Sequence, residues 1–252
     1  MSIPTDHPRY RSLMARERLA EMADRGLVTR TGLISHGRGE AFDYMMGERS
    51  LAQSVKAERA AAAFLLKAKN PVICVNGNAA ALDPRNLIIL AQEVPAKIEI
   101  NIFHRTEERM KLLISHMEEN GAENVLGADP DARIPGLSSD RALCTESGIY
   151  DSDVILVPIE DGDRAKALAD MGKIVISIDL NPLSRTSRTA AVSISDEMTR
   201  ALENMIIFVR EMKGRGETID ELIKTFSNDE NRRETINEIC SSLRSESGGV
   251  FK

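Results

Sequence analysis

Four polar segments of the sequence carry residues that could bind an anion such as phosphate. They are NGN at residues 76–78, NIFHRT at 101–106, EDGDR at 160–164, and DLN with the nearby SRT at 179–186. Arg binds phosphate oxygens through two hydrogen bonds, and the N–H groups that open a helix add donors. Asn, Asp, Ser and Thr also cap helices and form turns, so each segment alone has an equally good structural explanation. Together they indicate separate anion sites, enough for a nucleotide and a second phosphorylated molecule.

His36, Arg38 and the two aspartates of EDGDR could also take part in catalysis or bind a metal. The segment SHGRGE places His36 and Arg38 among glycines, where backbone can approach a ligand closely, and a histidine can accept a proton near neutral pH. A lone histidine is more often a structural donor. In EDGDR, Asp161 or Asp163 could hold Mg²⁺, although an acidic loop with a helix cap explains the same residues equally well. No GxxxxGK[ST] loop is present and no GxGxxG follows the first predicted strand, which disfavours a P-loop ATPase and a common dehydrogenase.

The polar segments follow short apolar runs that alternate with helical stretches. Strands are predicted at residues 71–76, 97–101, 124–127, 153–159 and 173–180. Strands that are apolar throughout and separated by helices form a parallel sheet covered on both faces. The fold class is therefore α/β, with a Rossmann-like doubly wound core from about residue 50 to 200. In such sheets ligands bind at the carboxyl ends of the strands, which is where the polar segments would converge.

Helical segments flank this core on both sides. Helices are predicted at residues 10–25, 50–69, 197–212 and 218–244. The glycine-rich stretch 32–40 is expected to be irregular, and the polar end 245–252 to be frayed. We expect one catalytic domain over residues 1–212, which includes the N-terminal helical segment 1–49, and a C-terminal helical extension over 213–252.

Composition narrows the function classes. The 252 residues carry 33 Lys and Arg against 39 Asp and Glu, a formal net charge of −6, with 4% aromatic residues and no Trp. This argues against a nucleic-acid binder that uses a basic stripe and stacking aromatics. No apolar run approaches the ~18 residues of a membrane helix, and the start is too charged for a signal peptide, so we expect a cytoplasmic protein with no membrane partner. Three scattered Cys suggest neither a disulfide framework nor a zinc site.

Longer blocks of the sequence carry a resemblance to a known family. They are HPRYRSLMARERL, GLISHGRGEAFDY, PVICVNGNAAAL, INIFHRTEER, GADPDARIPGL, GIYDSDVILVPIEDGDR and VISIDLNPLSRTSRTA. In this order and spacing, from about residue 4 to 201, the chain closely resembles the archaeal 4-phosphopantoate:beta-alanine ligases, or phosphopantothenate synthetases. The resemblance implies a Rossmann-like homodimer of coenzyme A biosynthesis. It implies that ATP, 4-phosphopantoate and beta-alanine, with Mg²⁺, give 4'-phosphopantothenate, AMP and diphosphate.

The resemblance also implies residue roles. The family's ATP contacts fall on Arg16, Arg38, Asp179, Leu180, Asn181, Arg185 and Thr186. A further nucleotide contact falls on DEMTR at residues 196–200, which includes Glu197 and Met198; the family often has Asn where Glu197 stands. For the substrate pocket we expect Asn76, Asn78, Asn101 and Arg105, with the phosphate of 4-phosphopantoate nearest Arg105.

The implied chemistry needs charge neutralisation and a base. The phosphopantoate carboxylate would attack the α-phosphorus of ATP, and beta-alanine would capture the resulting acyl-adenylate. Arg16, Arg38 and Arg185, with Mg²⁺, would neutralise the triphosphate, and Asp179 with Asn181 would recognise ribose or base. In the second step His36 or Asp161 would take the proton of the beta-alanine ammonium.

Two other functions fit the sequence less well. A nucleotide-sensing Rossmann-like module would bind ATP or AMP without turnover, and it would need no beta-alanine. A noncanonical NAD-binding oxidoreductase lacks the glycine-rich fingerprint that such enzymes use. The sequence leaves open the Mg²⁺ ligands, the subunit that supplies each site residue, feedback control and the role of residues 213–252.

Overall fold

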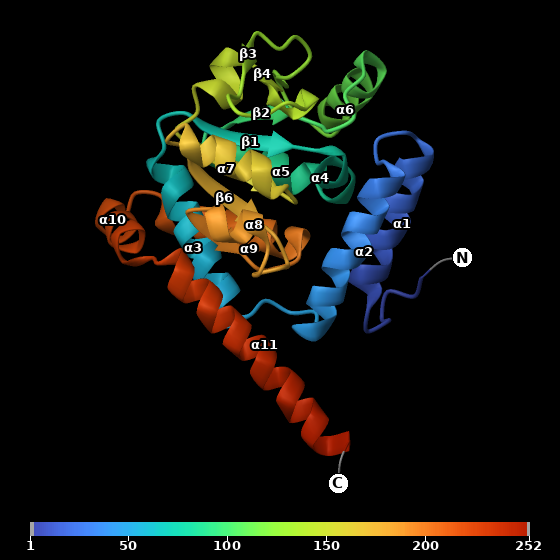
Figure 1. Ribbon diagram of the computed structural model, residues 1–252, viewed down its shortest axis with the longest axis vertical. Coiled ribbons are helices and arrows are strands. Elements are labelled where there is room, and N and C mark those ends of the chain that lie inside the picture. The colour runs from blue at the N-terminus through green and yellow to red at the C-terminus, as the bar shows by residue number, and fades with distance from the viewer. Residues whose placement is uncertain (1–2, 251–252) are drawn as a thin grey trace.

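A parallel β-sheet forms the centre of the computed structural model, which describes residues 3–250 (Figure 1). Within these residues the sheet has five strands in the order β2-β1-β5-β6-β7, and every neighbouring pair is parallel. The strands are β1 (Pro71–Val75), β2 (Lys97–Ile100), β5 (Val154–Pro158), β6 (Ile174–Ile178) and β7 (Val192–Ile194). The predicted doubly wound, Rossmann-like α/β fold is confirmed.

Side chains of each central strand alternate between two hydrophobic cores. Ile73 and Val75 of β1 belong to one core, and Val72 and Cys74 belong to the other. Successive side chains of a strand point to opposite faces, so this division shows that both faces of the sheet are covered. The first core contains α3 (Ala52–Lys67), α5 (Pro84–Glu93) and α9 (Met198–Met212). The second contains α7 (Gly162–Asp170) and the short hairpin of β3 (Ala132–Arg133) and β4 (Leu143–Cys144).

The predicted strand at residues 124–127 is wrong. Only Leu126 of this segment bridges the sheet, to Glu99 of β2. Asn124 and Gly127 adopt φ angles of 52° and 108°, which turn the chain away on either side and prevent a longer ladder. The fifth strand is β7, a three-residue run that pairs with β6 and was not predicted.

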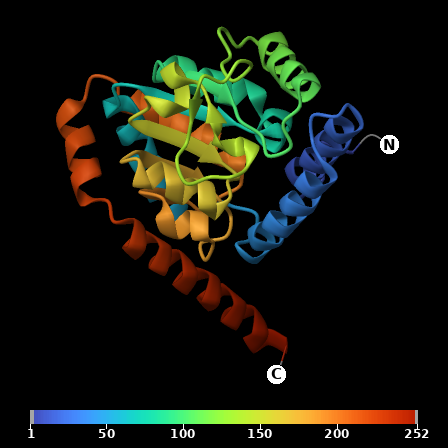
Figure 2. The same ribbon diagram turned by 45° about the horizontal axis from the view of Figure 1, so that its top comes forward.

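The prediction of an irregular segment at residues 32–40 is also wrong, because α2 (Arg30–Met45) runs through it. Thr29 caps this helix by accepting a hydrogen bond from the Gly32 N–H at 3.1 Å. A Cβ at Gly32 would lie 2.4 Å from Oδ1 of Asn78, so this glycine is required by close helix packing. His36 and Arg38 therefore lie on a helix. Figure 2 shows α2 beside α1 (Tyr10–Asp24) as a pair of helices against the core.

The C-terminal segment contains two helices after α9, where one was predicted over 218–244. They are α10 (Gly216–Thr225) and α11 (Asn228–Val250). The helical segment is interrupted before Asn228. The side-chain oxygen of Asn228 accepts from the Ser193 N–H (2.8 Å), and its side-chain nitrogen donates to the Ala190 carbonyl (2.9 Å). This side chain fixes the start of α11 at the edge of the sheet.

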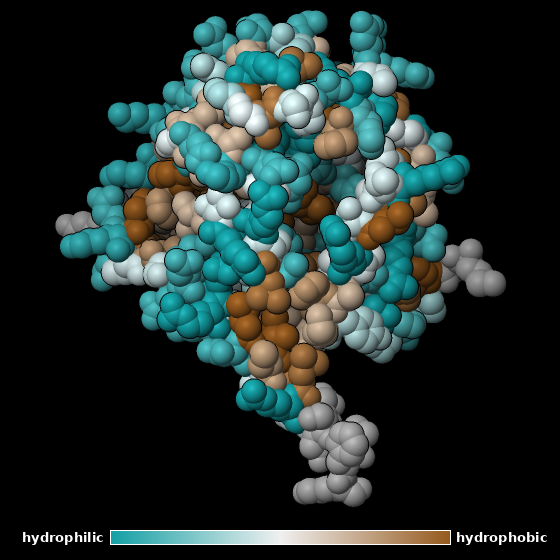
Figure 3. Space-filling model, in the orientation of Figure 1, coloured by the Kyte–Doolittle hydropathy of each residue, from teal (hydrophilic) through white to brown (hydrophobic). Residues whose placement is uncertain are grey.

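A frayed end was predicted for residues 245–252. The helix α11 instead continues through residues 245–250, because the backbone hydrogen bonds of its preceding turns extend into them. Residues 251–252 lie outside the described residues. Apolar side chains gather over this helix and beside it in Figure 3. Ile239 of α11 packs with Met46 and Leu51 in a small third core. No helix of the described part of the chain is long and apolar enough to cross a membrane. The expected domain boundary at 212/213 stays a prediction.

The remaining described elements connect this framework. They are α4 (Gly77–Leu82), α6 (Glu107–Glu119), α8 (Arg185–Thr189), the 3-10 turn η1 (Asp140–Ala142) and the π-helical turn η2 (Glu146–Tyr150).

Candidate active site

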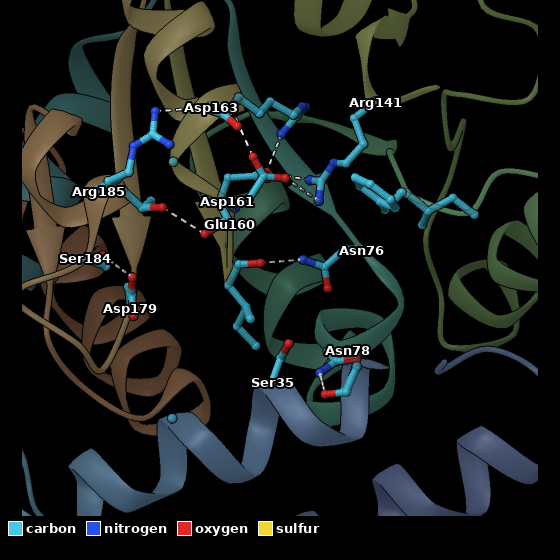
Figure 4. Close-up of a pocket in the computed structure, with 18 of the residues that line it drawn as sticks. Ser35, Asn76, Asn78, Arg141, Glu160, Asp161, Asp163, Asp179, Ser184 and Arg185 are labelled. Atoms are coloured by element: carbon cyan, nitrogen blue, oxygen red, sulfur yellow. Dashed lines mark hydrogen bonds and ion pairs between the residues drawn. The ribbon is translucent and has the colours of Figure 1, made fainter. Parts of the chain in front are cut away.

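A cavity of about 1250 Å³ opens at the carboxyl ends of β1, β5 and β6. After β1 the chain crosses to β2 on one side, and after β5 it crosses to β6 on the other. Neighbouring strands whose connections leave in opposite directions create a crevice, and open α/β sheets bind their ligands there. The strand order therefore places the cavity where a ligand is expected (Figure 4).

Asn76 joins the ends of the two central strands. Its side-chain nitrogen donates to the carbonyls of Pro158 (2.9 Å) and Ile159 (3.0 Å), and its oxygen accepts from the Ala79 N–H at the start of α4. Ile159 adopts φ 55°, a conformation that β-branched residues rarely take, and the bonds from Asn76 hold it. Asn76 lines the cavity as predicted, and it also holds the loop that carries Glu160 and Asp161.

The helix α2 supplies one wall. Ser35, His36 and Arg38 line the cavity from this helix, and Asn78 lines it from α4 while donating to the Gly32 carbonyl at 2.8 Å. Burial lowers the pKa of His36 below its ordinary value, so the imidazole is neutral at pH 7. Arg38 is exposed. The structure thus brings the predicted base and one predicted cation together.

The loop after β5 carries a buried ion-pair triad that we call the Arg–Glu–Arg triad, of Arg141, Glu160 and Arg164. Arg141 Nη2 lies 2.5 Å from Oε2 of Glu160, and Arg164 Nη1 binds the same oxygen. The other oxygen of Glu160 accepts from the Asp161 N–H at 2.9 Å. The side chain of Glu160 is 1% exposed, so both guanidiniums act on a desolvated carboxylate.

The residues after β6 form the opposite wall. Burial raises the pKa of Asp179, although its carboxylate accepts from Ser184 Oγ (2.5 Å) and from the Asn181 N–H (3.0 Å). Thr186 Oγ1 donates to the Glu160 carbonyl at 2.8 Å and so connects this wall to the loop after β5. Arg185 is exposed and lies 2.6 Å from Asp163. Leu180 and Asn181 line the cavity beside them, as predicted.

The start of α9 closes the cavity. Glu197 caps this helix by accepting from the Thr199 and Arg200 N–H groups, and burial raises its pKa. Glu197 and Met198 both line the cavity, as predicted. Arg200 is 2.5 Å from Asp43 of α2 and 2.6 Å from Asp196, so one guanidinium joins α2 to the start of α9.

Three predicted site residues do not line the cavity. Arg16 pairs with Glu40 at 2.8 Å between α1 and α2. Asn101 is buried and donates to the carbonyls of Arg141 and Leu143. Arg105 donates to the carbonyls of Gly127 (2.6 Å) and Ala128 (2.8 Å), which hold its guanidinium to a loop. In each case the polar side chain satisfies a neighbouring part of the fold.

Two cavity arginines lie outside the polar segments and were not predicted. Arg141 comes from the turn η1, and Arg109 of α6 donates to the carbonyls of His104 (2.7 Å) and Leu27 (2.9 Å). Arg141 follows no predicted strand, so the only signal in the sequence is its position directly before the apolar run ALC at residues 142–144. Arg109 lies in the first turn of α6, where charged side chains are usually exposed.

The cavity contains carboxylates that could bind a divalent cation, but each of them already contacts another group of the protein. Asp161 caps α7 through its contact with the Arg164 N–H (3.1 Å), Asp163 pairs with Arg185, and Asp179 binds Ser184. Residues 3–250 contain no group of three His, Cys, Asp or Glu arranged to hold a metal alone. This donor set fits Mg²⁺ that arrives with a triphosphate and takes one or two protein carboxylates.

The fold and cavity define a doubly wound α/β protein with an arginine-rich ligand site at its switch point. Residues 53–242 match the phosphopantothenate/pantothenate synthetase family. Three relatives are each named 4-phosphopantoate–beta-alanine ligase. The one from Methanosarcina mazei is 54% identical over 96% of this chain and 96% of its own; that from Methanospirillum hungatei is 50% identical over 83% and 86%. The one from Thermococcus onnurineus is 46% identical over 100% and 98%. The chain belongs to the phosphopantothenate/pantothenate synthetase family.

Proposed function

We propose that this protein is an ATP-dependent ligase that condenses 4-phosphopantoate with beta-alanine to give 4'-phosphopantothenate, AMP and diphosphate. The observation that carries the proposal is the 46–54% identity to ligases of that name over 96–100% of the chain. A cavity of about 1250 Å³ is large enough for a nucleotide beside a second small molecule.

In the first step the carboxylate of 4-phosphopantoate attacks the α-phosphorus of ATP and diphosphate leaves. Arg38 and Arg185 are exposed cations on opposite walls of the cavity, so they can contact the triphosphate and the negative charge that develops on it. Arg185 must exchange Asp163 for phosphate. This exchange costs little, because an exposed ion pair contributes at most about 1 kcal/mol. Asp179 and Asn181 accept and donate hydrogen bonds where ribose or base would lie.

In the second step the beta-alanine amine attacks the acyl-adenylate carbonyl and releases AMP. The amine must first lose a proton, and we assign its acceptance to His36 in preference to Asp161. Burial keeps the imidazole of His36 neutral and therefore able to accept a proton. Asp161 already caps α7 with one oxygen, and its other oxygen lies 3.9 Å from Arg141.

We extend the proposal to Mg²⁺ and to a homodimer. Mg²⁺ would reduce the charge of the triphosphate, with Asp161, Asp163 or Asp179 as its protein ligands. The apolar surface of α11, on which Leu243 is 46% exposed, supports contact with a second copy. Dependence of turnover on Mg²⁺ and the mass in solution by light scattering test these two points. A cytoplasmic location stays a prediction.

The deciding experiment measures AMP release from ATP and Mg²⁺ with 4-phosphopantoate, with and without beta-alanine. We expect AMP in equal amount to 4'-phosphopantothenate only when all three substrates are present. Arg38→Ala and Arg185→Ala should abolish AMP formation, while Arg188→Ala, an exposed arginine of α8 outside the cavity lining, should retain it. ATP binding without turnover in any combination would favour the sensor, and wild-type turnover in both cavity variants would refute their roles.

A further inference from the structure

The Arg–Glu–Arg triad at the cavity has an excess of positive charge. Two guanidiniums share one oxygen of Glu160, and the neighbour of Arg164 on its other side is the Sγ of Cys74 at 3.3 Å. Burial raises the pKa of the Cys74 thiol, so this group is neutral, and the next carboxylate is that of the half-exposed Asp161, 3.9 Å from Arg141; the triad itself has one positive charge more than its buried carboxylate balances. Nε of Arg164 is also buried without any hydrogen-bond partner among residues 3–250. A buried cation in excess calls for an anion nearby.

Arg141 is the member of the triad through which such an anion can be reached. Its Nε donates to Oδ1 of Asn101 at 3.2 Å and its Nη2 to Glu160, whereas Nη1 donates to no atom of the described residues. The carboxylate oxygen nearest Nη1 is Oδ2 of Asp161, at 3.9 Å, beyond hydrogen-bonding distance. Arg141 lines the cavity although its side chain is only 8% exposed. Its free edge therefore faces the ligand.

The guanidinium is held in place before any ligand binds. Asn101 accepts from Nε of Arg141 and donates to the carbonyls of Arg141 and Leu143 at 3.3 Å and 2.9 Å, which fixes both ends of this residue. Ser138 and Ser139 line the cavity from the preceding loop and bring hydroxyl groups to the same wall. A fixed guanidinium loses little conformational entropy on binding, which makes it an effective anion receptor.

We propose that Arg141 binds the phosphate of 4-phosphopantoate and that this contact selects the phosphorylated substrate over pantoate. The inference rests on the proposed function, and it replaces Arg105, whose guanidinium is held by the Gly127 and Ala128 carbonyls. Asn101 then acts as a positioning residue for Arg141.

The position and the chemistry both favour the phosphate over the carboxylate of the substrate. In Figure 4 Arg141 lies across the cavity from Asp179, Ser184 and Arg185, where the nucleotide is placed. The reacting carboxylate must approach the α-phosphorus of ATP on that side, and it loses its negative charge when the adenylate forms. A permanent buried cation would oppose that loss. The phosphate keeps its charge through both steps, so its contact with Arg141 is not weakened as the reaction proceeds.

The test compares 4-phosphopantoate with pantoate in the Arg141→Met and Arg141→Lys variants. Met removes the charge at similar length and leaves the Glu160–Arg164 pair intact, so the fold should survive; thermal unfolding checks this. Arg133→Met, in the adjoining hairpin and outside the cavity lining, is the matched control. We expect Arg141→Met to raise KM for 4-phosphopantoate about 10- to 100-fold, the worth of one charge-assisted hydrogen bond. KM for pantoate should change less than about threefold, with Lys intermediate.

Calorimetric binding of the two compounds without ATP provides a readout that is independent of turnover. Equal losses for 4-phosphopantoate and pantoate would place Arg141 on a part that both share and overturn the inference. So would an unchanged preference in Arg141→Met, or a lost preference in Arg105→Met alone. If the wild-type protein forms no AMP with all three substrates, the proposed function fails instead. The binding comparison still decides whether Arg141 recognises a phosphate monoester.

Discussion

Glu58 of α3 is a buried carboxyl group that must carry a proton at neutral pH. The residue is 0% exposed, and Asn204 Nδ2 donates to its Oε2 at 2.9 Å. Oε1 of Glu58 and Oδ2 of the neighbouring carboxyl group of Asp196 are buried without a donor among the described residues. Two carboxylates repel each other, so one must be protonated. Burial, followed by the charge of Asp196, raises the pKa of Glu58 to about 9.

The sign and size of the effect on stability follow from this pKa. The folded state binds a proton that the unfolded chain releases near its ordinary value of 4.5, so stability is lost as the pH rises from there to about 9. The loss is at most about 1.4 kcal/mol for each pH unit in that window. In Glu58→Gln an amide N–H takes the place of the carboxyl proton, and the amide oxygen can still accept the hydrogen bond from Asn204. Its advantage in unfolding free energy over the wild type should therefore grow with pH.

The assay is denaturant unfolding of both proteins at about pH 6 and about pH 8. Over this interval the difference in unfolding free energy should increase by about 2–3 kcal/mol in favour of Glu58→Gln. Glu118→Gln, a surface change on α6, should show no such trend. Parallel pH dependences of the Glu58→Gln variant and the wild type would refute a protonated Glu58.

Three further outcomes follow from the packing. Arg200→Leu leaves the buried carboxylates of Asp43 and Asp196 unpaired and should cost about 3–5 kcal/mol in denaturant unfolding; a loss below about 1 kcal/mol would contradict this. Gly162→Ala places a Cβ 2.3 Å from that of Arg185, which a side-chain rotation cannot relieve, so α7 and α8 must move apart; Tm should fall and KM for ATP should rise. In a thiol-reagent titration the exposed Cys240 should react quickly, whereas the buried Cys74 and Cys144 should react only on unfolding.

The sequence alone was sufficient to predict those features in which each residue acts within its own segment. The apolar runs of β1, β5 and β6 were recognised because a strand buried on both faces needs no polar side chain. The helix starts at Asp83 and Thr106 also depend on local chemistry, because at each a side-chain oxygen accepts from an N–H three residues on. These elements fix the sheet, and the sheet order fixes the edge at which ligands bind.

Packing between distant segments decided the rest. The glycines of residues 32–40 predicted an irregular segment, yet the segment is helical and Gly32 permits its close contact with Asn78 of α4. Twelve of the fifteen predicted site residues line the cavity: His36, Arg38, Asn76, Asn78, Asp161, Asp179, Leu180, Asn181, Arg185, Thr186, Glu197 and Met198.

The sequence by itself determined the class of fold, the family and the segments that carry the chemistry. Only the tertiary structure decided which polar side chains remain available to a ligand. Arg16, Asn101 and Arg105 are engaged by Glu40, by the Arg141 loop and by backbone carbonyls. Arg141 keeps a free edge because Glu160 and Asn101 occupy the rest of its guanidinium. Residue type sets what a side chain can bind, whereas competing partners brought near by folding set what it does bind.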